Sequence, residues 1–191
     1  MVTAEPRIRR QSATLQAMQP PFIILTGASG SGKTTVAQLF AEKYSGECEV
    51  FFFDSIGVPS PEEMREKYGD GHQPGGAWQR AMTFHWIERA AAVLTTGRPV
   101  LLEGQIRIAF ILEALTSLGL TAHIVLVDCD DRTRTERLHA DRNQPELANA
   151  QMMSWTRYLR AEAVQAHCEI LDTSNLPPGK SAANLHALLF I

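Results

Sequence analysis

The chain has 191 residues, of which 45% are hydrophobic and 20% are charged, and its formal net charge at pH 7 is -3. This length and composition suit one globular domain and exclude a collagenous, low-complexity or largely disordered protein. No apolar run reaches the roughly 18 residues that span a bilayer, and the chain lacks the positive field that nonspecific nucleic-acid binding requires. We therefore expect neither a membrane nor a nucleic acid as a partner.

The three cysteines, Cys48, Cys129 and Cys168, are far apart and form no CxxC pair. They fit neither a disulfide framework nor a zinc site, so we expect a reducing, cytoplasmic environment. Residues 1–20 carry three arginines and no apolar block that could act as a signal peptide. We expect a disordered N-terminal extension over 1–20, with an organellar transit peptide as the alternative, and a folded domain over 21–191.

From Pro21 onward, short apolar runs alternate with helical patterns. The first run, PFIILTG, is rich in β-branched residues and bounded by Pro and Gly, as in a fully buried strand. The predicted strands are 21–27, 47–55, 99–105, 122–129 and 169–174. The predicted helices are 33–44, 62–68, 77–95, 107–118, 131–141, 146–167 and 180–189. This alternation predicts an α/β fold of three layers, in which helices cover both faces of a five-stranded parallel sheet.

The sequence GASGSGKT lies between the first predicted strand and the first predicted helix, and it satisfies the phosphate-loop (P-loop) pattern G-x-x-x-x-G-K-[ST]. Its glycines allow backbone N–H groups to approach phosphate oxygens, and the following helix adds its positive end. Lys33 can reach the β- and γ-phosphates, the Thr34 hydroxyl can bind Mg²⁺, and Thr35 can donate to an α-phosphate. The pattern predicts a site for ATP or GTP with Mg²⁺, formed by Gly27, Ala28, Ser29, Gly30, Ser31, Gly32, Lys33, Thr34 and Thr35.

Two acidic residues stand at the ends of predicted strands, where this class of sheet binds its ligands. Glu103 ends the third strand and is expected to help Thr34 hold Mg²⁺. Asp54 is the first polar residue after three phenylalanines, and its carboxylate can orient or deprotonate an attacking hydroxyl. A turn or helix-capping role is the alternative for Asp54.

Several arginines are candidates for binding anionic groups. Arg107 opens a predicted helix, where it either grips an anionic acceptor or is a surface residue. In the helix after the fourth strand, we expect Arg132 and Arg134 to lie on a solvated face among interleaved acids. Arg137 and Arg142 are near the far end of that helix, where a lid can carry an arginine to the transferring phosphoryl group.

Apolar residues at helical spacing mark two core-facing stripes. One comprises Trp78, Met82, Trp86, Ala90 and Val93, and the other comprises Met152, Trp155, Leu159, Ala163 and Ala166. Residues 78–80, including Arg80, border the Gly/Pro-rich stretch 69–76, so we expect them to line the acceptor pocket.

The chain resembles the adenylate-kinase-like branch of P-loop kinases over roughly residues 21–175, judged by element order and typical domain size. That branch includes nucleoside monophosphate kinases, shikimate kinase, gluconate kinase and chloramphenicol phosphotransferase. The segment EGQIR (103–107) is similar to the D-G-x-P-R segment of the monophosphate kinases, although Glu103 stands for Asp and the Pro is missing. The resemblance implies that Gln105 and Arg107 contact the acceptor. It also implies that helices within 56–95 bind the acceptor.

The resemblance has further implications for the nucleotide side of the site. Arg137 and Arg142 match the nucleotide-stacking and lid arginines, with a short lid over 137–150. The loop 172–179 matches the segment that packs on the base. Asp54 resembles the acid that activates the acceptor hydroxyl in chloramphenicol phosphotransferase.

Together these patterns predict an enzyme, monomeric or homodimeric, that transfers the γ-phosphoryl group of ATP to a small molecule. Two acceptor classes stay open: a nucleoside monophosphate gripped by Arg107, or an unphosphorylated hydroxyl compound activated by Asp54. The alternative is a nucleotide-gated P-loop ATPase or regulatory protein without a small-molecule acceptor.

Overall fold

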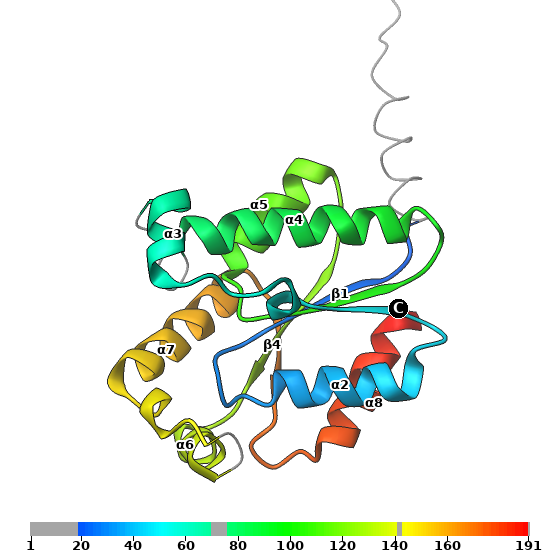
Figure 1. The fold of residues 1–191 in the computed structure, drawn as a ribbon. Helices are drawn as coiled ribbons and strands as arrows, with labels where there is room; N and C mark the ends of the chain where they lie inside the picture. Colours follow the sequence, from blue (N-terminus) through cyan, green and yellow to red (C-terminus); the bar gives the residue numbers. More distant parts are fainter. Residues whose placement is uncertain (1–18, 70–75, 141–142, 191) are drawn as a thin grey trace, which may run out of the picture.

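The computed structural model describes residues 19–69, 76–140 and 143–190. Within this part, five parallel strands form one sheet in the order β2-β3-β1-β4-β5 (Figure 1). The strands are β1 (Phe22–Thr26), β2 (Glu49–Phe52), β3 (Val100–Glu103), β4 (His123–Asp128) and β5 (Glu169–Asp172). The predicted α/β class and five-stranded parallel sheet are confirmed.

The helices follow the strands in the predicted order. They are α2 (Lys33–Tyr44), α3 (Pro61–Tyr68), α4 (Ala77–Leu94), α5 (Ile108–Leu118), α6 (Asp131–Ala140), α7 (Ala150–Gln165) and α8 (Pro178–Ala187). Short 3₁₀ turns are η1 (Phe53–Ile56), η2 (Pro145–Leu147) and η3 (Leu188–Phe190).

Most predicted boundaries lie within two residues of the observed ones, and two are wrong by three residues or more. The second strand was expected to reach residue 55, but it ends at Phe52, and Asp54 lies in the turn η1. The seventh helix was expected to begin at 146, but it begins at Ala150, because the Asn149 side chain accepts a hydrogen bond from the Met152 N–H (2.8 Å) and caps it there.

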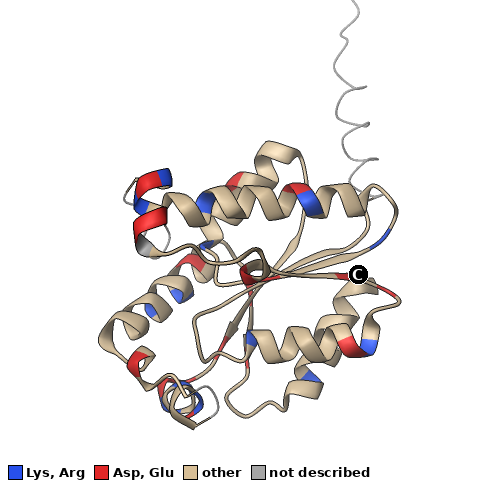
Figure 2. Cartoon of the chain, in the orientation of Figure 1, with Lys and Arg blue, Asp and Glu red and all other residues tan. Residues whose placement is uncertain are grey.

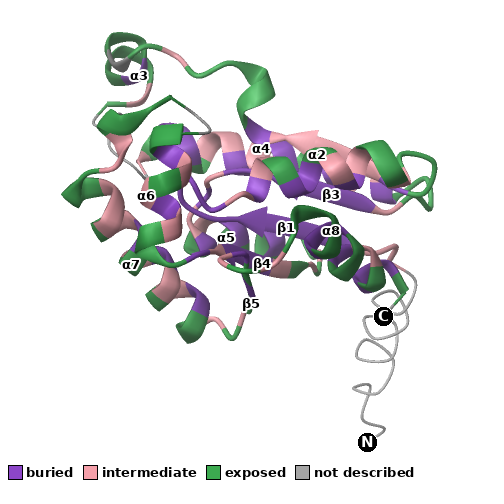
Figure 3. Cartoon of the chain, turned by 90° about the horizontal axis from the view of Figure 1, so that it is seen from below, coloured by how far each residue is buried: buried purple, intermediate pink, exposed green. Residues whose placement is uncertain are grey.

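The sheet is covered on both faces, which explains why its strands are apolar throughout. In β1, Phe22 and Ile24 face a core formed with α4 and α5, whereas Ile23 and Leu25 face a core formed with α2 and α8. Figure 1 shows α4 and α5 on one side of the sheet and α2 and α8 on the other. Figure 3 shows β1 and β3 in the colour of buried residues, and every residue of these two strands is buried.

The apolar stripes of α4 and α7 pack as predicted. Trp78, Trp86 and Ala90 of α4 are buried in the first core. Leu159 and Ala163 of α7 are buried in a third cluster, and Trp155 is partly buried against it. That cluster also includes Ala28 of the P-loop, so α7 and the loop share one apolar core.

Residues 1–18 of the predicted extension lie outside the described part of the chain. Gln19 is described, and it donates a hydrogen bond to the Thr121 carbonyl oxygen (2.6 Å). None of the helices among the described residues has the length and apolarity to cross a membrane. Lys and Arg are interspersed with Asp and Glu on α3, α4 and α6 (Figure 2).

The strand register brings polar residues together at the carboxyl ends of the strands. Leu25 of β1 pairs with Glu103 of β3 and with Val125 of β4. Asp128 of β4 pairs with Asp172 of β5. Since the P-loop follows directly after Thr26, it lies between the carboxyl ends of β3 and β4.

Candidate nucleotide and acceptor site

The P-loop has a shape that depends on glycine. Gly30 and Gly32 have φ values of 78° and 87°, in the left-handed region that disfavours other residues. A Cβ at Gly30 would also lie 3.0 Å from Cγ of Arg134. The Ser31 N–H donates to the Ala28 carbonyl oxygen (3.2 Å) and closes the turn.

The end of α2 at the P-loop fits a bound phosphate. Its N-cap residue is Gly32, which provides no side-chain hydrogen bond to the first turn of the helix. Helix N-termini without such caps leave N–H groups for an anion, and the helix dipole favours negative charge there. A Cβ at Gly27 would clash with the Val127 carbonyl oxygen, so the loop packs tightly on β4.

Three side chains converge beside this helix terminus. The Thr34 hydroxyl donates to Oε1 of Glu103 (2.9 Å), and Nζ of Lys33 lies 3.8 Å from the same oxygen. Lys33 is only 7% exposed and Glu103 only 5%. A buried lysine beside a carboxylate and a hydroxyl is an arrangement that can bind both phosphate and a divalent cation.

The same residues fit Mg²⁺. This ion prefers oxygen ligands and keeps several waters, so it needs few protein groups when phosphates supply the rest. Among the described residues, no group of three or more His, Cys, Asp and Glu could hold a metal. Beside the P-loop, Thr34 and Glu103 provide two oxygen-bearing side chains in direct contact with each other, which is compatible with such a partly hydrated ion.

Arg134 was expected on a solvated helix face, and this prediction is wrong. Its side chain is fully buried, and Nη1 donates to the Ser29 carbonyl oxygen (2.7 Å) while Nη2 donates to Oδ1 of Asp128 (2.6 Å). The expectation is confirmed for Arg132, which is exposed and pairs with Glu136 (3.6 Å). Arg134 thus fastens the P-loop to the end of β4.

Asp128 is a second residue that the sequence reasoning missed. Besides Arg134, it accepts a hydrogen bond from Nε of Arg160 on α7, and Nη2 of Arg160 donates to the Cys129 carbonyl oxygen (2.8 Å). The hydrogen bond to Asp128 raises the pKa of Arg160 further above its usual range. One strand-end carboxylate therefore joins the P-loop, α6 and α7.

Arg137, which the sequence assigned to a short lid over 137–150, lies beside the P-loop. Its Nη1 lies 2.9 Å from the Thr173 hydroxyl and 3.3 Å from the Ser31 carbonyl oxygen, and its Nη2 donates to the Thr173 carbonyl oxygen (2.8 Å). Thr173 belongs to the loop 172–179, which therefore also contacts the P-loop. Arg142 lies outside the described residues.

Of the residues predicted to contact the acceptor, Gln105 lies at the P-loop, whereas Arg80 lies on the surface. The Ser29 hydroxyl donates to Oε1 of Gln105 (3.3 Å), which brings Gln105 to the P-loop. Gln79 holds this segment, because its Nε2 donates to the Gln105 carbonyl oxygen (2.7 Å) and its Oε1 accepts from the Arg107 N–H (3.1 Å). Arg80 is 49% exposed and pairs instead with Glu113 on the surface of α5.

Asp54 is exposed in the turn η1, directly after β2. Three hydrogen bonds hold this turn: Nε1 of Trp86 donates to the Phe53 carbonyl oxygen (3.0 Å), the Gly57 N–H donates to the Asp54 carbonyl oxygen (3.1 Å), and the Ser55 hydroxyl donates to the Phe52 carbonyl oxygen (2.6 Å). The carboxylate is therefore solvent-accessible on an anchored turn, as an acceptor-activating group requires.

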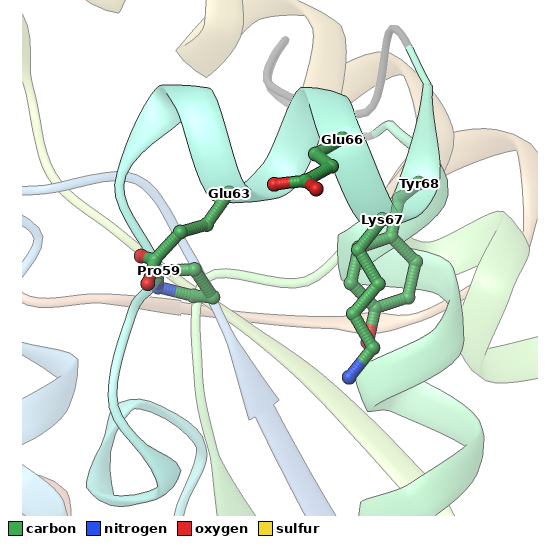
Figure 4. Close-up of a pocket in the computed structure, with 5 residues that line it drawn as sticks. All are labelled: Pro59, Glu63, Glu66, Lys67 and Tyr68. Carbon is green, nitrogen blue, oxygen red and sulfur yellow. The ribbon is translucent and has the colours of Figure 1, made fainter.

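Two cavities lie near these candidate acceptor residues or in the segment expected to bind the acceptor. One of about 540 Å³ lies against α3 and is lined by Pro59, Glu63, Glu66, Lys67 and Tyr68; Figure 4 shows Lys67 and Tyr68 projecting the same way from the helix. This cavity falls in the region 56–95 that was expected to bind the acceptor. The other, of about 320 Å³, is lined by Arg107, Gln151, Ser154, Trp155 and Tyr158.

The three-layer fold with a P-loop after its central strand defines a P-loop nucleotide-binding domain. Residues 22–163 match the AAA domain family designated AAA_33, and the chain belongs to this family. No curated protein matches the chain.

Solved structures of small-molecule kinases share the fold. Shikimate kinase from Acinetobacter baumannii aligns with a TM-score of 0.60 and 22% identity, over 94% of this chain and 97% of that one. The Deinococcus radiodurans tunicamycin resistance protein aligns with a TM-score of 0.62 and 20% identity, over 88% and 95%. A gluconokinase from Sinorhizobium meliloti aligns with a TM-score of 0.56 and 16% identity, over 90% and 92%. The predicted P-loop kinase resemblance is confirmed at the level of fold.

Proposed function

We propose that this protein is an ATP-dependent phosphotransferase that moves the γ-phosphoryl group to the hydroxyl of a small-molecule acceptor. The observation that carries the proposal is the cluster of Lys33, Thr34 and Glu103, in which the lysine and the hydroxyl both lie within 4 Å of one carboxylate oxygen at the start of α2. The fold shared with small-molecule kinases supports this reading.

The P-loop would hold the phosphates through its N–H groups and Lys33, and Thr34 and Glu103 would hold Mg²⁺. When bound, the cation neutralises charge on the β- and γ-phosphates. Arg137 lies beside the loop, where its guanidinium can stabilise the charge that develops during transfer. The chain contributes mostly positioning and electrostatics, as phosphoryl transfer requires.

The transfer itself involves an acceptor hydroxyl. The acceptor oxygen forms a bond to the γ-phosphorus while the bond from that phosphorus to the β–γ bridging oxygen breaks. The electron pair of the broken bond leaves with ADP. The hydroxyl proton passes to the Asp54 carboxylate, which acts as a general base.

The proposal is tested by ADP release across a panel of nucleotides, sugars, shikimate-like acids and phenicol antibiotics. We expect at least one compound to accelerate ADP release by the wild type, and none to do so with Lys33→Ala. The matched control is Lys43→Ala, which removes an exposed lysine from the other end of α2 and leaves activity unchanged. If no compound raises the rate above background, a nucleotide-gated ATPase replaces the kinase.

A further inference from the structure

The wall of the cavity beside Arg107 is built from stacked planar groups. The rings of Trp155 and Tyr158 are stacked, with centroids 5.3 Å apart and an interplanar angle of 14°. The Arg107 guanidinium lies 4.9 Å from the centroid of Tyr158 and 4.9 Å from that of Phe110. Such surfaces favour flat, apolar ligand groups, because aromatic rings stack on one another at these separations.

The positive charge of Arg107 is already compensated. Its Nη2 lies 3.4 Å from Oε1 of Glu162 and also contacts the Tyr158 hydroxyl, which donates to Glu162. Glu162 is fixed in place, because its Oε2 accepts a hydrogen bond from the Ile108 N–H (3.0 Å) at the start of α5. A phosphate brought to Arg107 would therefore also meet a carboxylate, and its binding would be weakened by the repulsion.

The other described residues that line this cavity add no positive charge. Burial and the hydrogen bond to Glu162 raise the pKa of Tyr158, so it stays neutral. Gln151, Ser154 and Trp155 are uncharged. The cavity against α3 carries two glutamates and one lysine. Among the described residues, neither cavity thus has a cluster of cations such as favours a phosphorylated acceptor.

The cavity beside Arg107 is within reach of the P-loop. Arg107 is four residues after Glu103, and four residues of extended chain span at most about 14 Å. The hydrogen bond between Ser29 and Gln105 holds the intervening segment against the loop. A ligand in this cavity can therefore present a hydroxyl toward the phosphates.

We propose that this cavity takes the phosphoryl acceptor, and that the acceptor is an uncharged hydroxyl compound with a flat aromatic or heteroaromatic ring. The inference rests on the proposed function and adds to it the binding site and the chemical class of the hydroxyl acceptor. A volume of about 320 Å³ is near the lower end of small-molecule sites and suits a single ring system with its substituents. The ring lies against Trp155, and Gln151 and Ser154 supply polar contacts.

The test compares matched neutral and phosphorylated compounds. Thymidine, uridine and pyridoxine are each titrated beside their 5′-phosphates, with Mg²⁺ and a non-hydrolysable ATP analogue present, and binding is followed by calorimetry and ligand-observed NMR. We expect at least one neutral compound to bind the wild type tenfold or more tightly than its phosphate. We expect Trp155→Ala to weaken that binding roughly tenfold and Trp155→Phe to preserve most of it.

A second variant alters charge without removing a ring. Glu162→Gln still accepts the Ile108 N–H but no longer compensates Arg107, so we expect it to improve the binding of the phosphorylated compound. The matched control is Glu113→Gln, which removes an exposed acid that pairs with Arg80 and should change neither affinity. If Trp155→Ala does not fold, Gln151→Ala, at an exposed position on the same wall, replaces it with an expected severalfold loss.

The proposal is overturned if the phosphorylated members bind more tightly to the wild type, if no compound binds, or if the cavity variants leave binding unchanged. These outcomes are separable from failure of the proposed function, because binding is measured without turnover. Neutral compounds that bind without releasing ADP from ATP would refute the kinase and leave the cavity assignment standing. ADP release with the phosphorylated members alone would refute the cavity assignment and leave the kinase standing.

Discussion

Replacing Arg134 with Met tests whether this buried cation holds the P-loop. Methionine fills much of the space above Gly30 but donates no hydrogen bond, so the bonds to Ser29 and Asp128 are lost. Each hydrogen bond that involves a charged group contributes about 1.5–3 kcal/mol, and breaking a buried ion pair costs about 3–5 kcal/mol. Since Asp128 keeps Arg160 as a partner, we expect a loss of about 3–4 kcal/mol in the free energy of unfolding.

The loss is measured by urea unfolding and by thermal melting, where it corresponds to a drop in Tm of roughly 10 °C. Calorimetry with Mg·ATP gives a second readout, because a displaced Ser29 carbonyl alters the loop that binds phosphate. Arg132→Met is the control: it removes an exposed arginine from the same helix and should change stability by less than about 0.5 kcal/mol. The reasoning is refuted if Arg134→Met stays within about 1 kcal/mol of the wild type with unchanged nucleotide affinity.

Four further outcomes are expected. Thr34→Val should raise the Mg²⁺ concentration needed for half-maximal ADP release about tenfold, whereas Thr34→Ser, which keeps the hydroxyl, should not. Asp54→Asn should reduce kcat at least a hundredfold while acceptor affinity, measured by calorimetry, stays unchanged; loss of affinity instead would contradict a general base. Gly30→Ala should destabilise the protein by about 1–3 kcal/mol in urea, because of its φ of 78° and its contact with Arg134. Burial raises the pKa of the Cys48 thiol to about 12 in the folded protein, from the value of about 9 expected in the unfolded chain. As pH rises, the unfolded chain therefore loses this proton before the folded protein does. The free energy of unfolding should fall as pH rises from about 9 toward 12. Cys48→Ala should remove this part of the alkaline loss, and equal slopes of unfolding free energy against pH in both proteins would count against it.

The order of strands and helices could be read from the sequence because it depends on local pattern. The run FIILT is apolar at every position, and the structure buries every one of its residues, on alternating faces of the sheet. Element ends depended on less regular features. The second strand stops at Phe52 because the chain turns there into η1, held by a hydrogen bond from Trp86, which is distant in sequence.

The P-loop residues were predictable because their chemistry requires one contiguous motif, whereas their supporting contacts were not. Arg134 lies in a helix composed mostly of polar residues. In the folded protein its buried side chain donates a hydrogen bond to the Ser29 carbonyl oxygen, which is 105 residues earlier in the chain. One sequence feature could have indicated that Arg134 is buried. Leu138 is four residues after Arg134, so both lie on the same face of α6, and Leu138 is fully buried. Glu162 compensates the positive charge of Arg107, but the two residues are 55 positions apart in the sequence. No local sequence pattern reveals this pairing.

The central place of β1 has a practical consequence. All five of its residues are buried, and it is hydrogen-bonded on both sides, to β3 and to β4. We therefore expect that β1, which carries the P-loop, does not unfold locally and that it unfolds only when the sheet unfolds as a whole. Any ligand that grips the loop must consequently protect the entire domain against heat, so melting curves alone can rank candidate nucleotides without a label or an activity assay.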